Sequence, residues 1–339
     1  DCLTLDLDPW PRLGGKGAYI DLLGRGDFAS MYVAEIEPGG HLEPERHIHE
    51  EIIYVLAGRG STTLDLPGYG ERTFEWHRGS LFGIPVNARH QHFNASGTEP
   101  TRFAAVTNLP ILMNVFHNQG FIFENDFAFT DRVGDGKYLL GQGDYRPVKP
   151  GRQQWQTLLV PDLPSMELPD FHARGAEGKH LHFVLSEASM HAHMAELPAA
   201  RYKKAHRHPA GAHIFTVTGQ GYTILWLEGE SIDDAIRFDW QTGSVEAPPE
   251  QYFHQHFNTG NEAARYLAIS FGSVRYPITA AGRHMYENLD VPAKSGGTQI
   301  DYEDEDPKVY DDFLAALART GTAPRIERPN YRTPAAAAR

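Results

Sequence analysis

The string His-Gln-His-Phe-Asn occurs twice in this chain, at residues 90–94 and again at 254–258. Each copy follows a glycine, five further residues and a proline: Gly79 and Pro85 precede the first copy, and Gly243 and Pro249 the second. Because the copies are about 160 residues apart in a chain of 339 residues, the repeat predicts two copies of one domain. Histidine is a good ligand for transition metals, so the repeat also predicts metal sites.

The length of the chain suits two domains of ordinary size, which we expect at residues 1–150 and 151–339. A hydrophobic content of 41% is typical of a globular, soluble protein. The formal net charge of -13 disfavours nucleic acid and anionic membranes as partners. No stretch reaches 18 consecutive apolar residues, so no membrane span is expected. The expected partner is therefore a small molecule.

The single cysteine, Cys2, excludes an intrachain disulfide and is compatible with a reducing compartment. The first residues are acidic and contain proline, which is not the pattern of a secretory signal. We therefore expect a cytoplasmic protein.

Short segments rich in Val, Ile, Thr, Tyr and Phe predict an all-β protein. They lie at 28–36, 51–56, 61–66, 103–107, 213–218 and 222–227. Two Gly-x-Gly sequences, at 58–60 and 219–221, are expected to form tight hairpins, and 141–164 is expected to be the linker. One short helix is predicted at 309–318, with Asp306 as its N-cap, Pro307 in its first turn and Gly321 beyond its end.

The second copy of the repeat has the clearer ligand pattern. Alternate residues on a strand share a face, so His206 and His208 should point together into the space that their sheet encloses. His254 or His256 can supply a third nitrogen. Three imidazoles suit Fe, Zn, Ni or Cu, and Mn if a carboxylate joins them.

These motifs resemble those of the cupin superfamily, and specifically of the two-domain bicupins. The second cupin motif, Gly-x5-Pro-x-Gly-x2-His-x3-Asn, is matched by both repeats, with Asn87 and Gln251 in place of its inner glycine. The resemblance covers residues 28–108 and 190–272. It implies two double-stranded β-helix (jelly-roll) barrels, which the short C-terminal helix predicted above would follow, and a homo-oligomer.

The first cupin motif, Gly-x5-His-x-His-x(3,4)-Glu-x6-Gly, implies different ligand sets in the two halves. In the first half the spacing from Glu51 to Gly58 fits, and the implied ligands are His47, Glu51 and His90. Glu45 or His49 is a fourth candidate. Such a set suits Mn or Fe, or else it is a degenerate site that only stabilises the barrel.

In the second half, Ala212 stands where the motif has its glutamate, and strand alternation turns the adjacent His213 to the opposite face. The implied centre is His206, His208 and His254. This combination is similar to gentisate and 1-hydroxy-2-naphthoate dioxygenases, although their three-histidine site is in the first cupin and Ile214 replaces an arginine of their motif.

The resemblance implies a non-haem Fe(II)-dependent dioxygenase that cleaves a C–C bond of a small anionic, chelating substrate, such as an aromatic hydroxy acid, a diol or a diketone. Mn, Ni and Zn are alternatives to iron. His256 and Tyr252 are the candidate catalytic residues. Arg201, Lys203 and Lys204 either attract this substrate or form a solvated surface. The alternatives are an oxygen-independent decarboxylase, lyase or isomerase that uses the first-half site, and a non-catalytic metal-binding bicupin.

Overall fold

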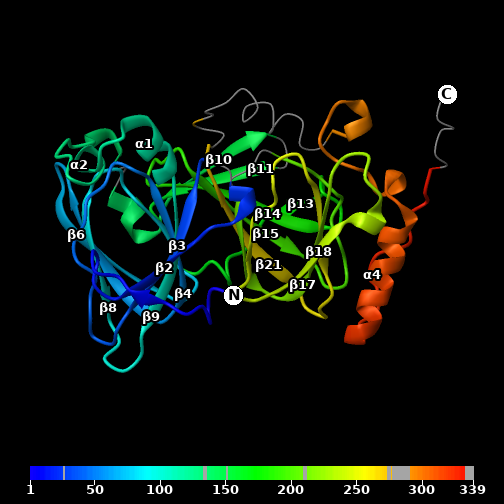
Figure 1. The fold of residues 1–339 in the computed structure, drawn as a ribbon, viewed down its shortest axis with the longest axis horizontal. Helices are drawn as coiled ribbons and strands as arrows, with labels where there is room; N and C mark the ends of the chain where they lie inside the picture. The colour runs from blue at the N-terminus through cyan, green and yellow to red at the C-terminus, as the bar shows by residue number, and fades with distance from the viewer. Residues whose placement is uncertain are drawn as a thin grey trace.

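The computed structural model describes residues 1–25, 27–132, 136–149, 152–208, 212–272, 276 and 291–332. Most regular structure in these ranges is β-strand, and it forms two barrels side by side (Figure 1). Each barrel combines one large sheet with one three-stranded sheet. This arrangement confirms the prediction of an all-β protein with two jelly-roll halves.

The first barrel is drawn in blue and cyan in Figure 1. Its seven-stranded sheet has the order β1 (Asp8–Pro9), β2 (Lys16–Ile20), β3 (Ser30–Ile36), β9 (Thr101–Thr107), β4 (Glu51–Ala57), β7 (Leu81–Ile84), β12 (Leu159–Val160). Its three-stranded sheet has the order β6 (Gly70–His77), β5 (Arg59–Leu66), β8 (Arg89–Asn94). Two short helices follow β9: α1 (Leu109–Phe116) and α2 (Gln119–Phe123).

The second barrel repeats this plan. Its eight-stranded sheet has the order β10 (Asp144–Lys149), β11 (Arg152–Thr157), β14 (Gly178–Leu185), β15 (His191–Leu197), β21 (Ala264–Ser270), β16 (His213–Thr218), β19 (Val245–Glu246), with β13 (Asp170–Phe171) paired to β14. Its three-stranded sheet has the order β18 (Ile236–Gln241), β17 (Gln220–Trp226), β20 (Phe253–Asn258).

Strand alternation decides which repeat residues face the barrel interior. In β8 the buried residues are His90, His92 and Asn94, while the residues between them are more exposed. Since side chains of a strand alternate between faces, the two histidines of the first repeat share the interior face. In β20 all six residues are buried, because other parts of the chain cover its outer face as well.

The two Gly-x-Gly sequences are corners between sheets, so the prediction of hairpins is wrong. β4 pairs with β7 and β9, whereas β5, on the other side of Gly58, pairs with β6 and β8. Gly219 separates β16 from β17 in the same way. Both glycines have left-handed backbone, with φ of 79° and 100°, which lets the chain turn sharply from one sheet into the other.

The segment 141–164 is not a simple linker, because its described residues contain strands of both barrels. β10 and β11 join the second sheet, and β12 then pairs with β7 of the first. At the N-terminus, the Cys2 amide donates to the carbonyl of Gly243 in the second half. Each half therefore receives a segment from outside its own residue range. The boundary between residues 150 and 151 stays a proposal.

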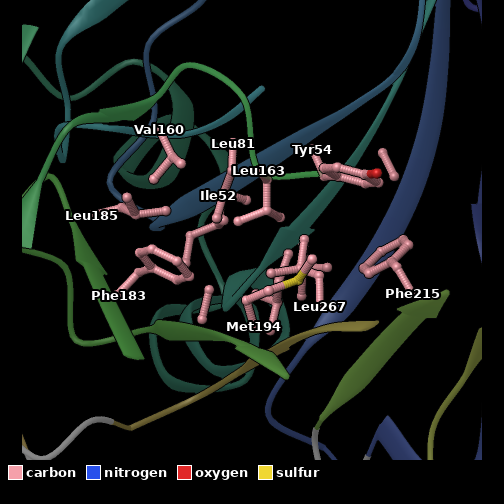
Figure 2. Packing of buried hydrophobic residues seen from close by; sticks show 14 of the residues in the cluster. Ile52, Tyr54, Leu81, Val160, Leu163, Phe183, Leu185, Met194, Phe215 and Leu267 are labelled. Atoms are coloured by element: carbon pink, nitrogen blue, oxygen red, sulfur yellow. The ribbon is translucent and has the colours of Figure 1, made fainter. Parts of the chain in front are cut away.

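A shared core joins the two large sheets (Figure 2). Ile52 and Leu81 from the first half pack there with Phe183, Met194 and Leu267 from the second. All five are fully buried. Burying this apolar surface holds the barrels together, since each side chain of this size contributes about 1.5–3 kcal/mol when removed from water.

Glu50 adds a polar contact between the halves. Its carboxylate accepts hydrogen bonds from the Ser189 amide at 2.7 Å, the Ser189 hydroxyl at 2.5 Å and the Met190 amide at 3.0 Å. The Asn108 side chain also donates to it, at 3.2 Å. These donors compensate the burial of the charged carboxylate.

The predicted C-terminal helix is confirmed as α4 (Pro307–Thr320). The Asp306 side chain accepts from the Lys308 amide, and Gly321 ends the helix in the left-handed conformation. Phe313 and Leu317 pack against Tyr202 and Phe257, so α4 covers the outer face of the small sheet of the second barrel (Figure 1). Among the described residues, no helix has both the length and the apolar character that crossing a bilayer requires.

Candidate metal centres

In the first barrel, four predicted residues converge. Glu45 and His47 come from the loop before β4, Glu51 begins β4, and His90 lies on β8. The Nε2 atom of His47 is 3.6 Å from the nearer Glu51 oxygen, and the Nε2 atom of His90 is 3.7 Å from Glu45 and 4.0 Å from Glu51. Atoms bound to one ion at about 2.1 Å lie roughly 3 to 3.5 Å apart, so a small contraction would bring these atoms to a common cation.

In the second barrel, His206, His208 and His254 converge. Their ligand nitrogens lie within 4.8 Å of one another, and the rings of His206 and His254 are centred 4.3 Å apart. We predicted that His206 lies on a strand. It lies outside the regular strands and forms an isolated bridge with His254 on β20. His208 ends the described part of its loop, since residues 209–211 lie outside the described ranges.

Backbone carbonyls fix the imidazole tautomer at four of these positions. The Nδ1–H of His47 donates to the carbonyl of His49 at 2.8 Å, and that of His90 donates to Ala88 at 3.0 Å. In the second barrel, Nδ1 of His206 donates to Lys204 at 3.2 Å, and Nδ1 of His254 to Tyr252 at 3.4 Å. In its neutral form, each ring thus carries its proton on Nδ1 and presents a lone pair on Nε2, the arrangement that ligating histidines commonly adopt.

Buried ligand atoms without a hydrogen-bond partner show that a cation would fit both centres. Among the described residues, the Nε2 atoms of His47, His90 and His254 and one oxygen of Glu51 are buried and have no such partner. Leaving a buried polar atom unpaired costs about 1–3 kcal/mol. A bound cation would satisfy all of these atoms at once.

The first centre is held together by charge. Burial raises the pKa values of Glu51 and Glu45, but His47 lowers that of Glu51 and His90 lowers that of Glu45, so that both are lowered overall. Burial likewise opposes a rise in the pKa of His47, but Glu51 and Glu45 raise it overall. Tyr32 donates a 2.5 Å hydrogen bond to the other oxygen of Glu51. A divalent cation would take the place of the His47 proton between these carboxylates.

Among the described residues, the second centre contains imidazoles and no carboxylate. Burial lowers the pKa values of His206 and His254 well below the usual range, and nearby positive groups lower them further. Ala212, where the motif has its glutamate, is itself buried. His213 begins β16, whose alternate residues Phe215 and Val217 belong to the core between the barrels, and strand alternation therefore gives it the outer face.

His49 and His92 lie beside the first centre. The ring of His49 stacks on His47 at a centroid distance of 3.5 Å, and burial followed by the charge of His47 lowers its pKa to about 3. One ring nitrogen of His92 lies within 4.8 Å of a carboxylate oxygen of Glu51 and of a ring nitrogen of His90. Burial, followed by the charge of His90, lowers the pKa of His92 to about 3, so both rings are neutral near pH 7.

The second histidine of each repeat belongs to a matching chain of hydrogen bonds. In the first barrel the indole N–H of Trp76 donates to the Thr62 hydroxyl, which lies 2.8 Å from Nδ1 of His92. In the second, the indole N–H of Trp240 donates to Thr223, which lies 2.8 Å from Nδ1 of His256. In His92 and His256 the Nδ1 atom thus faces a threonine hydroxyl, whereas in the candidate ligand histidines it faces a backbone carbonyl.

Glu246 is present in the hydrogen-bonded group of the second barrel and, within the part of the chain that the structure describes, has no acidic counterpart in that of the first. The sequence motifs did not reveal it. It pairs with Ile214 across β19 and β16, as Phe82 pairs with Ile53 in the first barrel. One Glu246 oxygen is 3.3 Å from Nδ1 of His256, and the other is buried without a hydrogen-bond partner among the described residues. The only sequence signal was an acidic residue inside a Gly-x5-Pro segment.

The interiors of the barrels also differ. The first barrel is filled by large apolar side chains, including Ile53, Phe82 and Phe103. The apolar cluster inside the second barrel contains only Ala195, Ile214, Tyr266 and Ala268. The second barrel therefore has the more polar interior.

Two buried cations lie near the second centre. Lys203 is buried, and its Nζ is 2.5 Å from the hydroxyl of Tyr266. Burial, with help from Arg174 and Arg152, lowers the pKa of Lys203 to about 7. Arg174 is buried and donates to the Gln299 side chain at 3.0 Å. The prediction of a solvated basic surface is thus wrong for Lys203, whereas Lys204 and Arg201 form ion pairs with Asp301 and Glu177.

The aromatic residues around the second repeat have mostly structural surroundings. Tyr222, Trp226 and Phe253 pack on the outer face of the small sheet, and Phe215 packs between the barrels. Tyr252 is partly exposed, and its carbonyl is the acceptor for His254. A catalytic role for Tyr252 stays a prediction.

The inner glycine of the second cupin motif is replaced by residues that keep its backbone conformation. Asn87 and Gln251 have φ of 59° and 71°. Asn tolerates this left-handed region better than most residues, and the Asn87 side chain donates to the carbonyls of Asn125 and Phe127. The motif geometry is therefore retained in both barrels despite the substitutions.

Comparison with known proteins supports this fold. Residues 32–107 match the cupin domain family. Oxalate decarboxylase from Bacillus subtilis, solved at pH 4.6, has a TM-score of 0.50 and 16% identity over 80% of this chain and 75% of its own. A serine-to-alanine variant of that enzyme has a TM-score of 0.51 and 17% identity over 81% and 77%.

Vicilin from hazelnut, Corylus avellana, has a TM-score of 0.48 and 10% identity over 78% of this chain and 85% of its own. No match was found among curated proteins. Residues 32–107 thus match a cupin domain, and the fold of the chain is similar to that of oxalate decarboxylase.

Proposed function

We propose that the chain is a non-haem Fe(II)-dependent dioxygenase, with its reaction centre at His206, His208 and His254 in the second barrel. The observation that supports this most is the convergence of three imidazoles, with no carboxylate beside them among the described residues, inside the more polar barrel. Iron bound there would supply activation of dioxygen. Three protein ligands leave coordination positions for a substrate and for oxygen.

The charge of this centre favours an anionic substrate. Three neutral ligands leave the double charge of a metal ion uncompensated in a buried site. Arg174 adds positive charge, since it lowers the pKa of both His206 and His254. A substrate that binds through two oxygen atoms as an anion, such as an aromatic hydroxy acid, an ionised diol or an enolised diketone, would balance this charge.

His256 is the proposed acid or base beside the bound substrate. Its ring is 5.5 Å from that of His254, and Glu246 and Thr223 both lie next to its Nδ1 atom. These two groups orient the ring and leave Nε2 as the atom that can exchange a proton with a substrate. Ile214 occupies the place of an arginine in the gentisate dioxygenase motif, so gentisate itself is not the proposed substrate.

Oxygen uptake tests this proposal. The protein is loaded with Fe(II) under argon, and oxygen consumption is then followed with a panel of catechols, aromatic hydroxy acids and β-diketones. At least one member should support turnover, which His208→Ala abolishes and His77→Ala, a change on the exposed surface, leaves intact. Absence of both oxygen uptake and ligand-induced spectral change across the panel would overturn the proposal.

A second candidate function is oxygen-independent decarboxylation or a related lyase or isomerase reaction at the first centre. The convergence of Glu45, His47, Glu51 and His90 favours it, together with the structural similarity to an enzyme named oxalate decarboxylase. It predicts anaerobic turnover, for example of oxalate, that is lost in His47→Ala and retained in His208→Ala. If neither centre supports turnover but metal removal lowers the melting temperature, the protein is a non-catalytic metal-binding bicupin.

A further inference from the structure

A third group of histidines lies inside the second barrel, on strands β14 and β15. His180 and His182 occupy alternate positions of β14, and His193 on β15 is the direct cross-strand partner of His182. The ring of His180 is centred 4.4 Å from that of His182 and 4.7 Å from that of His193. Ligand nitrogens of all three lie within 4.8 Å of one another, as in the centre of His206, His208 and His254.

The three rings face the barrel interior. Their neighbours on the two strands, Leu181, Phe183 and Met194, belong to the core between the barrels, so the histidines take the opposite face. His180 and His182 are buried, and His193 is partly buried. The Nδ1 atom of His193 is buried without a hydrogen-bond partner among the described residues.

The first barrel shows that this position does not require histidine. His193 pairs with Ala268 of β21 as Tyr32 pairs with Ala105 of β9, which makes the two positions equivalent. His182, opposite His193, then corresponds to Tyr19, opposite Tyr32. In the first barrel these tyrosines pack edge to face with Trp10. An aromatic cluster in the first barrel thus takes the place of the three imidazoles in the second.

The three imidazoles are in the protonation state that binds metals. Burial lowers the pKa values of His180, His182 and His193 well below the usual range, and nearby positive groups lower them further. A neutral imidazole offers a lone pair on one ring nitrogen, so three rings at contact distance can share one cation. A bound cation would also pair with the buried Nδ1 atom of His193.

The surrounding charge determines what else this group would bind. Arg152 and Lys203 are among the positive groups that lower the pKa of His180 and His193. The Arg152 guanidinium lies over the Phe171 ring at 4.5 Å. Burial lowers the pKa of Lys203 to about 7, so about half of its amine is protonated at pH 7. A cation held by the three rings would therefore take an anion, such as chloride or a carboxylate, as its remaining ligand.

We propose that His180, His182 and His193 form a second metal site in the second barrel, which binds a divalent transition ion such as Zn(II), Co(II) or Ni(II) through three nitrogens. Three imidazoles and an open position are a common ligand set for these ions. The site shares its barrel with the centre of His206, His208 and His254.

Cobalt binding to the full chain tests this site. The protein is stripped of metal with a chelator and titrated with Co(II), and bound cobalt is counted by elemental analysis and by its visible absorption. His182→Ala should bind one equivalent less than the wild type. His208→Ala should lose a different equivalent, and the double variant should lose both. His77→Ala, on the exposed surface, should bind as much as the wild type.

His193→Tyr provides a second variant, because it introduces the residue that the first barrel carries at this position. It should fold and also lose one equivalent of cobalt. The proposal is overturned if folded His182→Ala and His193→Tyr both retain the cobalt stoichiometry and spectrum of the wild type. This outcome leaves the proposed function intact, since that function depends on His208 and not on His182.

Discussion

A carboxylate oxygen of Glu246 lies 3.3 Å from Nδ1 of His256, whereas Phe82 occupies the equivalent position beside His92 in the first barrel. The two repeats thus place the same histidine next to an acid in one barrel and next to a hydrocarbon ring in the other. Because the duplicated series of Trp, Thr and His is otherwise the same, we propose that Glu246 assists proton transfer at His256 in the second barrel.

Glu246→Gln is expected to lower turnover by about 100-fold, since acid–base groups contribute at least about this factor. The amide can still contact His256, but it cannot stabilise the imidazolium that forms when the ring takes up a proton. Metal content should not change, because Glu246 is not part of the group of His206, His208 and His254. Turnover and bound iron measured on the same sample check both statements. Activity equal to the wild type would remove Glu246 from the reaction.

Asn258 is expected to be essential for stability and not for metal binding. Its amide donates to the carbonyls of Leu197, Pro198 and Glu262, and its oxygen accepts from the Gly260 amide. Asn258→Asp replaces the donor with a carboxylate that faces carbonyl oxygens, which should lower the free energy of unfolding by on the order of 3 kcal/mol. Urea unfolding measures this change.

Asn261→Asp, on the exposed surface nearby, serves as the control and should change stability by less than about 0.5 kcal/mol. Equal effects of the two substitutions would show that the hydrogen bonds of Asn258 are not what stabilises this corner. The last residue of His-Gln-His-Phe-Asn makes equivalent contacts in the first barrel, where Asn94 donates to Ile36, Glu37 and Glu99.

Glu305 should make the protein less stable as the pH rises through neutrality. Burial raises its pKa from the ordinary 4.5 to about 7, although Tyr202 and Gln255 donate hydrogen bonds to it. A carboxyl group with a raised folded pKa contributes stability that is fully present below pH 4.5 and is lost as the pH rises through 7. The loss is on the order of 3 kcal/mol.

Glu305→Gln removes this titration. The difference in unfolding free energy between the variant and the wild type should therefore grow in favour of the variant between pH 5 and pH 8, in the range set by the pKa of about 7. Chemical denaturation at several pH values gives this difference directly. If the difference in unfolding free energy stays constant over this range, Glu305 is ionised in the folded protein at every pH measured, which contradicts the prediction.

The repeated motif predicted the two barrels, and Asp306, Pro307 and Gly321 predicted the C-terminal helix. The cupin spacing selected His47, Glu51 and His90, and the Nε2 atoms of both histidines lie within 4.0 Å of one Glu51 oxygen; their role as metal ligands stays a prediction. Gly58 was misread, since left-handed glycine suits both a hairpin and a corner, and only the long-range pairing of β4 and β5 distinguishes them.

Glu246 and the histidines of β14 and β15 could not be predicted from spacing. Glu246 reaches His256 only because β19 pairs with β16, and His182 meets His193 only because β14 pairs with β15. Such contacts depend on sheet register, which a single sequence does not reveal. The burial of Lys203 likewise depends on the fold, as a short run of basic residues is solvated in most proteins.

Metal content of the native protein, compared between the wild type, His47→Ala and His208→Ala, tests the central claim most directly. The claim is that the three-histidine centre of the second barrel holds the iron that supports turnover. We predict that His208→Ala loses both its iron and its oxygen uptake, while His47→Ala keeps the oxygen uptake. Loss of turnover in His47→Ala with full activity and iron retained in His208→Ala would contradict the claim and place the reaction in the first barrel.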